Sequence, residues 1–405
     1  MPIYLDYAAT TPVDPRVAAA LLQYLTQDGV FGNPSSSTHV FGRQAAQAVE
    51  TARRQVAALL HATPGEIVWT SGATEANNLA LRGAMRAYAK QGRHLITSKT
   101  EHKAVLDVYR QLEREGCAVT YLDPDPDGLI PPERLASALR PDTVLVSLMH
   151  VNNETGVIQD LTAIGALTRA HGILLHVDAA QSAGKLPLDL QTLAVDLLSV
   201  SAHKLYGPKG IGTLYVRQQP RRVRLAPLLY GGGQERGLRP GTLATHQIVA
   251  MGEACRIAAA EMASEQARIR QLHDTLWQAL AALDGVQLNG HPEHNMAGIL
   301  NVSFGGVAAE ALLTALPDLA VSTGSACTSA DHQPSHVLRA MGCDIFRARG
   351  AVRFSLGRFT TAQDIAYTIN AVTAAVTRLR ALSPLWATRQ RRSVDANAVD
   401  WGALP

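Results

Sequence analysis

The residues best able to carry chemistry lie where apolar segments, which we expect to be β-strands, come to an end. The segment 195–200 runs into Ser201, His203 and Lys204. The segment 173–177 runs into Asp178, with Gln181 three residues further on. The carboxyl ends of parallel strands meet at one edge of an open sheet, where such sheets bind ligands. We therefore expect these polar side chains to line one pocket.

Taken alone, each of these features has an ordinary explanation. A lysine after a strand is usually solvated, and an aspartate there usually caps a helix. The turn at 72–74, Gly-Ala-Thr before a helical pattern, could be only a tight turn, although helix N-termini also bind phosphate. The pair Asn152–Asn153 is most often turn chemistry. Only their combination points to a specific site.

That combination meets the needs of pyridoxal phosphate. The cofactor requires a lysine for a Schiff base, a carboxylate at its pyridinium nitrogen and a cradle for its phosphate. Lys204 supplies the first, Asp178 the second, and Gln181 could reach the ring oxygen. The predicted phosphate donors are Ala73, Thr74, Ser201 and His203.

The patterns of other cofactors are weaker. The glycines of 207–212 lie between two strand-like segments, which is a poor dinucleotide fingerprint. Gly184-Lys185 lacks the upstream glycine of a nucleotide-binding loop, and no His-Glu-x-x-His occurs. Dinucleotide, nucleoside triphosphate and zinc-peptidase sites are therefore disfavoured.

Cys327 is an independent candidate for chemistry. The four cysteines, at 117, 255, 327 and 343, form neither a disulfide framework nor a C-x-x-C motif, which suggests a reducing compartment. Unpaired cysteines are usually small buried hydrophobic residues, and we expect this of the other three. Cys327 instead lies in a run of small, mostly hydroxylated residues at 322–330. We expect an exposed, flexible loop with a reactive thiol, whose thiolate form is the nucleophile.

The surrounding segments predict an α/β fold with a large, mostly parallel sheet. Near-continuous apolar segments alternate with helical patterns, which is typical of a parallel sheet covered on both faces. An Ala-rich helical pattern from His246 to about Leu283 predicts a connector helix, followed by shorter, mixed strands and a last helix. We predict an N-terminal segment, 1–14, that packs with the small domain, a large cofactor-binding domain, 15–260, and a small domain, 261–405, with the cysteine loop at about 322–334.

The composition is that of a globular protein with no broad nucleic-acid footprint. Of 405 residues, 47% are hydrophobic and 18% charged, and the net charge is only +3. Aromatic residues make up 5%, which disfavours base-stacking platforms. No apolar run approaches the roughly 20 residues that span a membrane, and the first residues do not resemble a secretion signal. We expect a cytoplasmic protein without direct contact with nucleic acid or membrane.

Seven segments resemble the cysteine desulfurases of the IscS/NifS type, within the class V pyridoxal-phosphate enzymes. They are Tyr4–Pro12, Thr70–Glu75, Thr100–Lys103, His150–Glu154, Ser201–Lys204, Gly324–Cys327 and Arg353–Arg358. The resemblance covers nearly the whole chain and implies the aspartate aminotransferase-like fold of pyridoxal-phosphate-dependent transferases. It also implies removal of sulfur from L-cysteine, which gives L-alanine and a persulfide on Cys327.

The resemblance implies a role for each matching residue. Lys204 would hold the cofactor and shuttle protons, and His102 would stack on the ring and assist acid–base steps. Arg353 would bind the substrate carboxylate, with Asn33 nearby, and Asn153 would contact both cofactor and substrate. The implied cofactor contacts are Ala73, Thr74, His102, Asn153, Asp178, Gln181, Ser201, Ala202, His203, Lys204 and Thr242.

The resemblance further implies partners. Thr242 would reach the phosphate of a neighbouring subunit, which requires a homodimer. The persulfide sulfur would pass to an iron–sulfur scaffold protein of the IscU type and to other acceptors, including those for tRNA thiolation. Cys327 would then also be a transient ligand of a 2Fe-2S cluster shared with the scaffold.

Other functions stay open on the sequence alone. An aminotransferase on the same fold has no use for Cys327 in a flexible loop. A selenocysteine lyase would differ in a substrate preference that the sequence does not reveal. A catalytically silent docking scaffold is disfavoured because both Lys204 and Cys327 are present.

Overall fold

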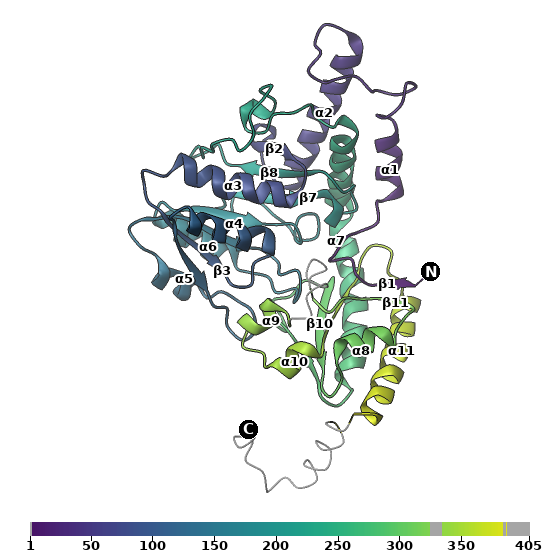
Figure 1. Ribbon diagram of the computed structural model, residues 1–405. Helices are drawn as coiled ribbons and strands as arrows, with labels where there is room; N and C mark the ends of the chain where they lie inside the picture. Colours follow the sequence, from purple (N-terminus) through teal and green to yellow (C-terminus); the bar gives the residue numbers. More distant parts are fainter. Residues whose placement is uncertain (1, 325–333, 384–385, 387–405) are drawn as a thin grey trace.

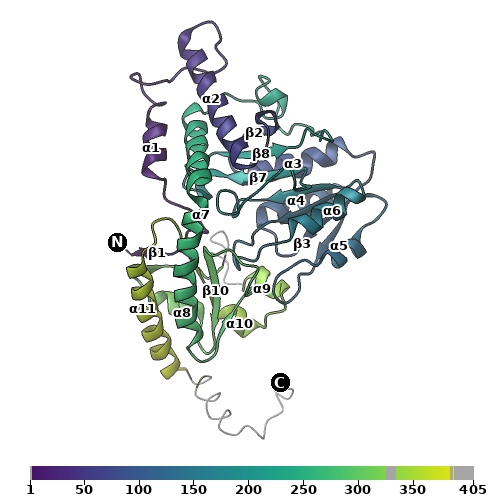
Figure 2. The same ribbon diagram turned by 180° about the vertical axis from the view of Figure 1, so that it is seen from behind.

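The computed structural model describes residues 2–324, 334–383 and 386, so Cys327 lies outside the described residues. Figures 1 and 2 show a larger part around a seven-stranded sheet and a smaller part around a three-stranded sheet, with one long helix running through both. None of the helices within the described ranges combines the length and apolar character of a membrane span.

The large sheet is mostly parallel, as predicted. Its strand order is β2-β8-β7-β6-β5-β3-β4, and only β8 runs antiparallel to its neighbours. The strands are β2 (Ile67–Thr70), β3 (His94–Ser98), β4 (Ala118–Leu122), β5 (Thr143–Met149), β6 (Leu174–Asp178), β7 (Leu197–Ser201) and β8 (Gly212–Val216). Because β5, β6 and β7 are parallel neighbours, the residues that follow them emerge at one edge of the sheet.

Helices cover both faces of this sheet and explain the near-continuous apolar strands. One face packs against α3 (Ala73–Ala87) and α4 (Lys103–Arg114). The other packs against α2 (Val40–Leu59), α5 (Pro132–Ala138) and α6 (Leu161–Ala170), and α1 (Pro15–Leu22) adds to the same core. Successive strand residues such as Leu95 and Ile96 are both fully buried, because each face has its own core.

The connector predicted from His246 to about Leu283 is α7, Thr245–Ala281, a helix of 37 residues. Its first half contributes Ile248 and Cys255 to the core beneath the large sheet. Its second half contributes Ile269 and Leu276 to the core of the smaller part. A single helix therefore sets how the two sheets are placed relative to each other (Figure 1).

The smaller part is built on an antiparallel sheet of order β12-β10-β9. Its elements are β9 (Val286–Leu288), β10 (Ile299–Phe304), α8 (Ala309–Thr314), β11 (Leu319–Ala320), α9 (His336–Ala340), α10 (Ile345–Arg349), β12 (Ala351–Ser355) and α11 (Ala362–Ala381). The N-terminal strand β1, Ile3–Tyr4, pairs in parallel with β11, and Leu5 enters this core. The N-terminal segment therefore leads from the small part toward the edge of the large sheet.

Candidate active site

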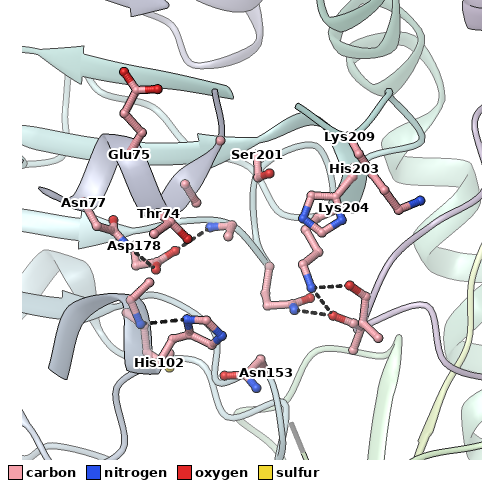
Figure 3. A pocket seen from close by; sticks show the side chains of 18 of the residues that line it. Thr74, Glu75, Asn77, His102, Asn153, Asp178, Ser201, His203, Lys204 and Lys209 are labelled. Carbon is pink, nitrogen blue, oxygen red and sulfur yellow. Dashed lines mark hydrogen bonds between the residues drawn. The ribbon is translucent and has the colours of Figure 1, made fainter. Parts of the chain in front are cut away.

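A pocket of about 420 Å³ opens at the carboxyl ends of the parallel strands (Figure 3). The starts of α3 and α4, the loop after β5 and the N-terminal segment complete its wall. The predicted site residues that line it are Ala73, Thr74, His102, Asn153, Asp178, Gln181, Ser201, His203, Lys204 and Arg353. Together with Ala8 and Ala9 of the N-terminal segment, they bring seven separate segments of the chain to one place.

Lys204 and Gln181 converge on the N-terminal segment. Lys204 follows β7 in a single 3₁₀ turn, Ala202–Lys204, and its Nζ donates hydrogen bonds to the carbonyls of Ala8 and Ala9, the latter at 2.7 Å. Gln181 Nε2 donates to Ala8 O at 2.8 Å, and Gln181 Oε1 is buried without a hydrogen-bond partner. The lysine amine and the glutamine amide therefore donate to the same backbone carbonyl, that of Ala8, and Figure 3 shows Lys204 in the pocket.

Asp178 is held by a residue that the sequence reasoning missed. Asn77 Nδ2 donates to Asp178 Oδ2 at 2.8 Å, and the Ala180 N–H donates to Asp178 Oδ1 at 2.9 Å. Asn77 lies on α3 with no exposed surface, among the alanines and leucines that face the sheet. A polar residue at a core position of an otherwise apolar helix face was the available signal, since buried polar groups need partners.

The opposite end of the pocket can cradle an anion. Gly72 precedes α3 with a φ of 152°, a conformation that side chains rarely adopt, and the helix begins at Ala73 beside the pocket. The free backbone N–H groups of a helix N-terminus attract negative charge. Ser201 Oγ lies close to this turn, since a Cβ added at Gly72 would be 3.8 Å from it. His203 also lines the pocket, but its Nδ1 lies 3.1 Å from Thr10 Oγ1 of the N-terminal segment. Burial lowers the pKa of His203 to about 4, so its ring is neutral at neutral pH.

His102 is fixed in one tautomer by its position as the N-cap of α4. Its Nδ1 accepts a hydrogen bond from the Ala104 N–H at 3.1 Å. Burial lowers the pKa of His102, so the ring is neutral at neutral pH. A neutral ring whose Nδ1 accepts must carry its proton on Nε2. His102 therefore offers the pocket an N–H donor.

The guanidinium group of Arg353 forms part of the buried wall of the pocket. Arg353 lies on β12 with 1% of its surface exposed. Nη1 donates to Asn153 O at 2.8 Å, Nη2 donates to Asp6 Oδ1 at 2.6 Å, and Nε has no hydrogen-bond partner. A planar guanidinium binds carboxylates through two parallel hydrogen bonds. The arrangement therefore suits a small substrate with a carboxylate group.

Three of the predicted residues that the structure describes do not line this pocket. Ala202 is fully buried behind it, and Thr242 and Asn33 are exposed and do not line it in a single chain. Asn33 Oδ1 accepts a hydrogen bond from the Ser35 N–H. Cys327 lies outside the described residues, as does the predicted cluster ligation by its thiol.

Three features of the pocket fit the binding of pyridoxal phosphate. A buried carboxyl group and a lysine amine project from neighbouring strand ends into the same cavity. An anion cradle lies at the start of α3. Buried oxygens on Asn77 and Gln181 have no hydrogen-bond partner, as expected of a wall that meets a polar ligand. Within the described ranges, no cluster of three or more His, Cys, Asp or Glu side chains could hold a metal ion.

The Asn77 contact can be tested by substitution. Asn77→Asp places a second carboxyl group beside Asp178, and two adjacent carboxyl groups tend to share a proton. Asp178 would then stabilise a protonated ring nitrogen less well, and we expect kcat to fall about 10- to 100-fold, since one pKa unit is worth about 1.4 kcal/mol. Asn77→Ala, which removes the hydrogen bond without adding charge, should lose less. Steady-state kinetics and a pH titration of the bound cofactor's absorbance measure both; equal loss in the two variants would contradict the charge argument.

Nearly the whole chain is similar to proteins of one known family. The family model for aminotransferase class-V matches residues 3–367. Cysteine desulfurase IscS of Shewanella loihica is 59% identical over 401 residues, which is 99% of each chain. A solved NifS-like protein superposes with a TM-score of 0.86 at 36% identity and covers 93% of this chain and 100% of its own. SspA in complex with cysteine gives a TM-score of 0.78 at 39% identity, with 88% of this chain and 99% of SspA covered.

Proposed function

Because this chain belongs to the aminotransferase class-V family and is a pyridoxal-phosphate-dependent cysteine desulfurase, we propose that the pocket residues divide between cofactor, substrate and sulfur. The observation that carries this assignment is the meeting of Asp178, Lys204 and Arg353 in one cavity at the strand ends. The net change is L-cysteine plus the Cys327 thiol giving L-alanine plus a Cys327 persulfide.

The cofactor-holding residues follow from their places in the pocket. Lys204 would attach the cofactor covalently, Asp178 would hold its ring nitrogen protonated, and Gln181 would contact its ring oxygen. Its phosphate would lie in the cradle of Ala73, Thr74, Ser201 and His203. When bound, the cofactor supplies an electron sink for bond cleavage on the substrate.

The chain's own groups then handle substrate and protons. Arg353 would orient the substrate through its carboxylate, and Asn153 would lie beside it. His102 would donate from Nε2, and Lys204 would move protons to and from the substrate carbon. The Cys327 thiolate would attack the substrate sulfur, the carbon–sulfur bond would break, and the sulfur would stay on Cys327 as a persulfide.

The Arg353 assignment predicts a defect in substrate binding. Arg353→Ala removes a charged two-point contact, and charge-assisted hydrogen bonds contribute about 1.5–3 kcal/mol each. We expect KM for L-cysteine to rise at least about 10-fold, with a smaller change in kcat. Arg353→Lys keeps the charge but not the fork and should recover only part of the loss. Initial rates and thermal melting separate this from misfolding; an unchanged KM in Arg353→Ala would exclude the role.

A homodimer accounts for the residues that the single-chain pocket leaves out. Thr242 is exposed, and we propose that it serves the phosphate cradle of a partner subunit. Large apolar side chains around α1 and α2 are exposed as well: Leu22, Leu25, Phe31, Val40 and Phe41. An exposed apolar group of this kind marks an interaction surface. A second copy would cover it and complete two pockets at once.

The sulfur acceptors are a scaffold protein for iron–sulfur clusters, of the IscU type, and proteins that pass sulfur on to tRNA. Delivery to such acceptors requires the persulfide to leave the pocket on a protein side chain, because free sulfide would be lost to solvent. A transient 2Fe-2S ligand role for Cys327 belongs to the same delivery step. We propose that the enzyme works in the cytoplasm.

The function is tested by incubating the purified protein with L-cysteine and following alanine, sulfide and protein-bound persulfide together. We expect one alanine per sulfur and a persulfide located on Cys327 by peptide mass spectrometry. Transamination would give no alanine from cysteine. Release of sulfide with alanine but without persulfide would indicate a lyase, and a parallel assay with L-selenocysteine measures that preference.

A further inference from the structure

Glu154 connects the pocket to both flanks of the span 325–333. Its Oε2 accepts a hydrogen bond from Ser335 Oγ, on the C-terminal side of that span. On the N-terminal side, a Cβ added at Gly324 would lie 3.4 Å from Glu154 Oε2 and 4.0 Å from Ser335 Cβ. Glu154 is 1% exposed. The two flanks therefore meet at one buried carboxyl group.

Glu154 is itself firmly placed beside the substrate region. Its N–H donates to Asn152 Oδ1 at 2.9 Å, and its carbonyl accepts from Asn301 Nδ2 at 2.9 Å. The preceding residue, Asn153, lines the pocket, and its carbonyl accepts from Arg353 Nη1. The carboxyl group thus extends the pocket wall without itself lining the pocket.

Two further contacts hold the same flanks. Ser322 and Arg353 exchange backbone hydrogen bonds of 2.7 and 3.2 Å. His336 Nε2 lies 3.0 Å from Glu101 O, next to His102. One flank is therefore attached to Arg353, which lines the pocket, and the other to Glu101, whose neighbour His102 lines it.

The distance that the Cys327 thiol can reach is limited mainly by the flank at Gly324, because fewer residues separate Cys327 from Gly324 than from Ser335. Cys327 is three residues after Gly324 and eight before Ser335. An extended chain spans at most about 3.3–3.6 Å per residue, which gives roughly 10–11 Å from Gly324 and roughly 26–29 Å from Ser335. The place of Gly324 therefore limits how far into the pocket the Cys327 thiol can reach.

We propose that Glu154 is a positioning residue for sulfur transfer: it holds the Gly324 and Ser335 flanks together against the pocket, so that the Cys327 thiol reaches the substrate sulfur. The inference rests on the proposed function and names the residue that controls the reach of its nucleophile. Glu154 touches neither substrate nor cofactor in this role, so its loss should slow sulfur transfer and leave substrate binding intact.

Substitutions of Ser335 can separate the effect of losing the Glu154–Ser335 hydrogen bond from an effect on local folding. Ser335 Oγ also accepts from the N–H groups of Val337 and Leu338 as the N-cap of α9. Aspartate is an equally good N-cap, so Ser335→Asp keeps the cap but sets a carboxylate against Glu154. In Ser335→Asp/Glu154→Gln, the amide can donate to that carboxylate and restore the connection. Ser335→Thr keeps the hydroxyl as a control, and Ser335→Ala removes it without adding charge.

Each variant is mixed with L-cysteine in a single turnover. We expect Ser335→Asp to show the cofactor absorbance change on cysteine binding within about 2-fold of the wild-type affinity. Persulfide on Cys327 should form at least about 10-fold more slowly. Ser335→Ala should be slowed about 3-fold or more, and Ser335→Thr and the double variant should return to within about 3-fold of wild type.

The outcomes distinguish a failure of the role proposed for Glu154 from a failure of the proposed function on which that role rests. Wild-type persulfide rates in Ser335→Asp or, should that variant fold poorly by thermal melting, in Ser335→Ala, would overturn the inference. So would a Ser335→Asp defect that Glu154→Gln does not relieve. If the wild-type protein itself formed no persulfide, the proposed function would fail, and the role proposed for Glu154 would fail with it.

Discussion

Lys204→Ala is expected to lose covalent cofactor attachment and to reduce turnover of L-cysteine by more than about 1,000-fold. Both effects share one cause, because the same amine would bind the cofactor and move protons, and general acid–base groups alone contribute about 10²- to 10⁴-fold. In the structure the amine donates hydrogen bonds to the carbonyls of Ala8 and Ala9. Absorbance of the purified protein and borohydride reduction followed by peptide mass spectrometry measure attachment directly.

Lys204→Arg is the matched control for charge. It keeps a cation beside the Ala8 and Ala9 carbonyls but cannot form the covalent link. We expect it to be as inactive as Lys204→Ala, with better thermal stability because these carbonyls keep a donor. Turnover within about 10-fold of wild type in Lys204→Arg would show that the charge alone suffices, and the assignment of Lys204 would then be wrong.

Cys327→Ser is expected to stop the reaction one stage later. Arg353, Lys204 and Asp178 line the pocket and are unchanged in this variant, so we expect substrate still to bind and change the cofactor absorbance. A serine hydroxyl is a much weaker nucleophile toward sulfur than a thiolate. Persulfide should be absent, and alanine release should fall by at least about 100-fold.

Single-turnover spectroscopy with parallel alanine analysis distinguishes this variant from Arg353→Ala. Cys327→Ser should show normal binding amplitude and no product, whereas Arg353→Ala should need higher L-cysteine for the same amplitude. Cys255→Ser is the natural thiol control, because Cys255 is buried in the core and burial raises its pKa to about 12. Alanine release at the wild-type rate from Cys327→Ser would instead point to a lyase that expels sulfide without a protein thiol.

Local patterns predicted the large-scale organisation because they act over short distances along the chain. Apolar strands alternating with helices require a parallel sheet covered on both faces, and the connector helix appears from Thr245 to Ala281. Residues after neighbouring parallel strands must emerge at one edge, so Asp178 and Lys204 could be paired from sequence alone. That argument needs only strand direction and the residues that follow each strand.

The contacts that tune the site were decided by the tertiary structure. Asn77 binds Asp178 across 101 residues of chain, and Ser335 reaches Glu154 across 181. No local pattern predicts such pairs, because they depend on how whole elements pack. The tautomer of His102 likewise depends on a cap that only the position of α4 reveals.

The sequence by itself thus determined the fold class and the type of chemistry, since strand-end residues and a cofactor's needs are readable from residue type and order. Tertiary structure decided which groups hold those residues: Asp6 on Arg353, Asn77 on Asp178 and Ser335 on Glu154. The physical reason is that hydrogen bonds act over about 3 Å in space and are indifferent to separation along the chain. Which polar side chains come that close is settled only when the two cores and the helix α7 between them are packed.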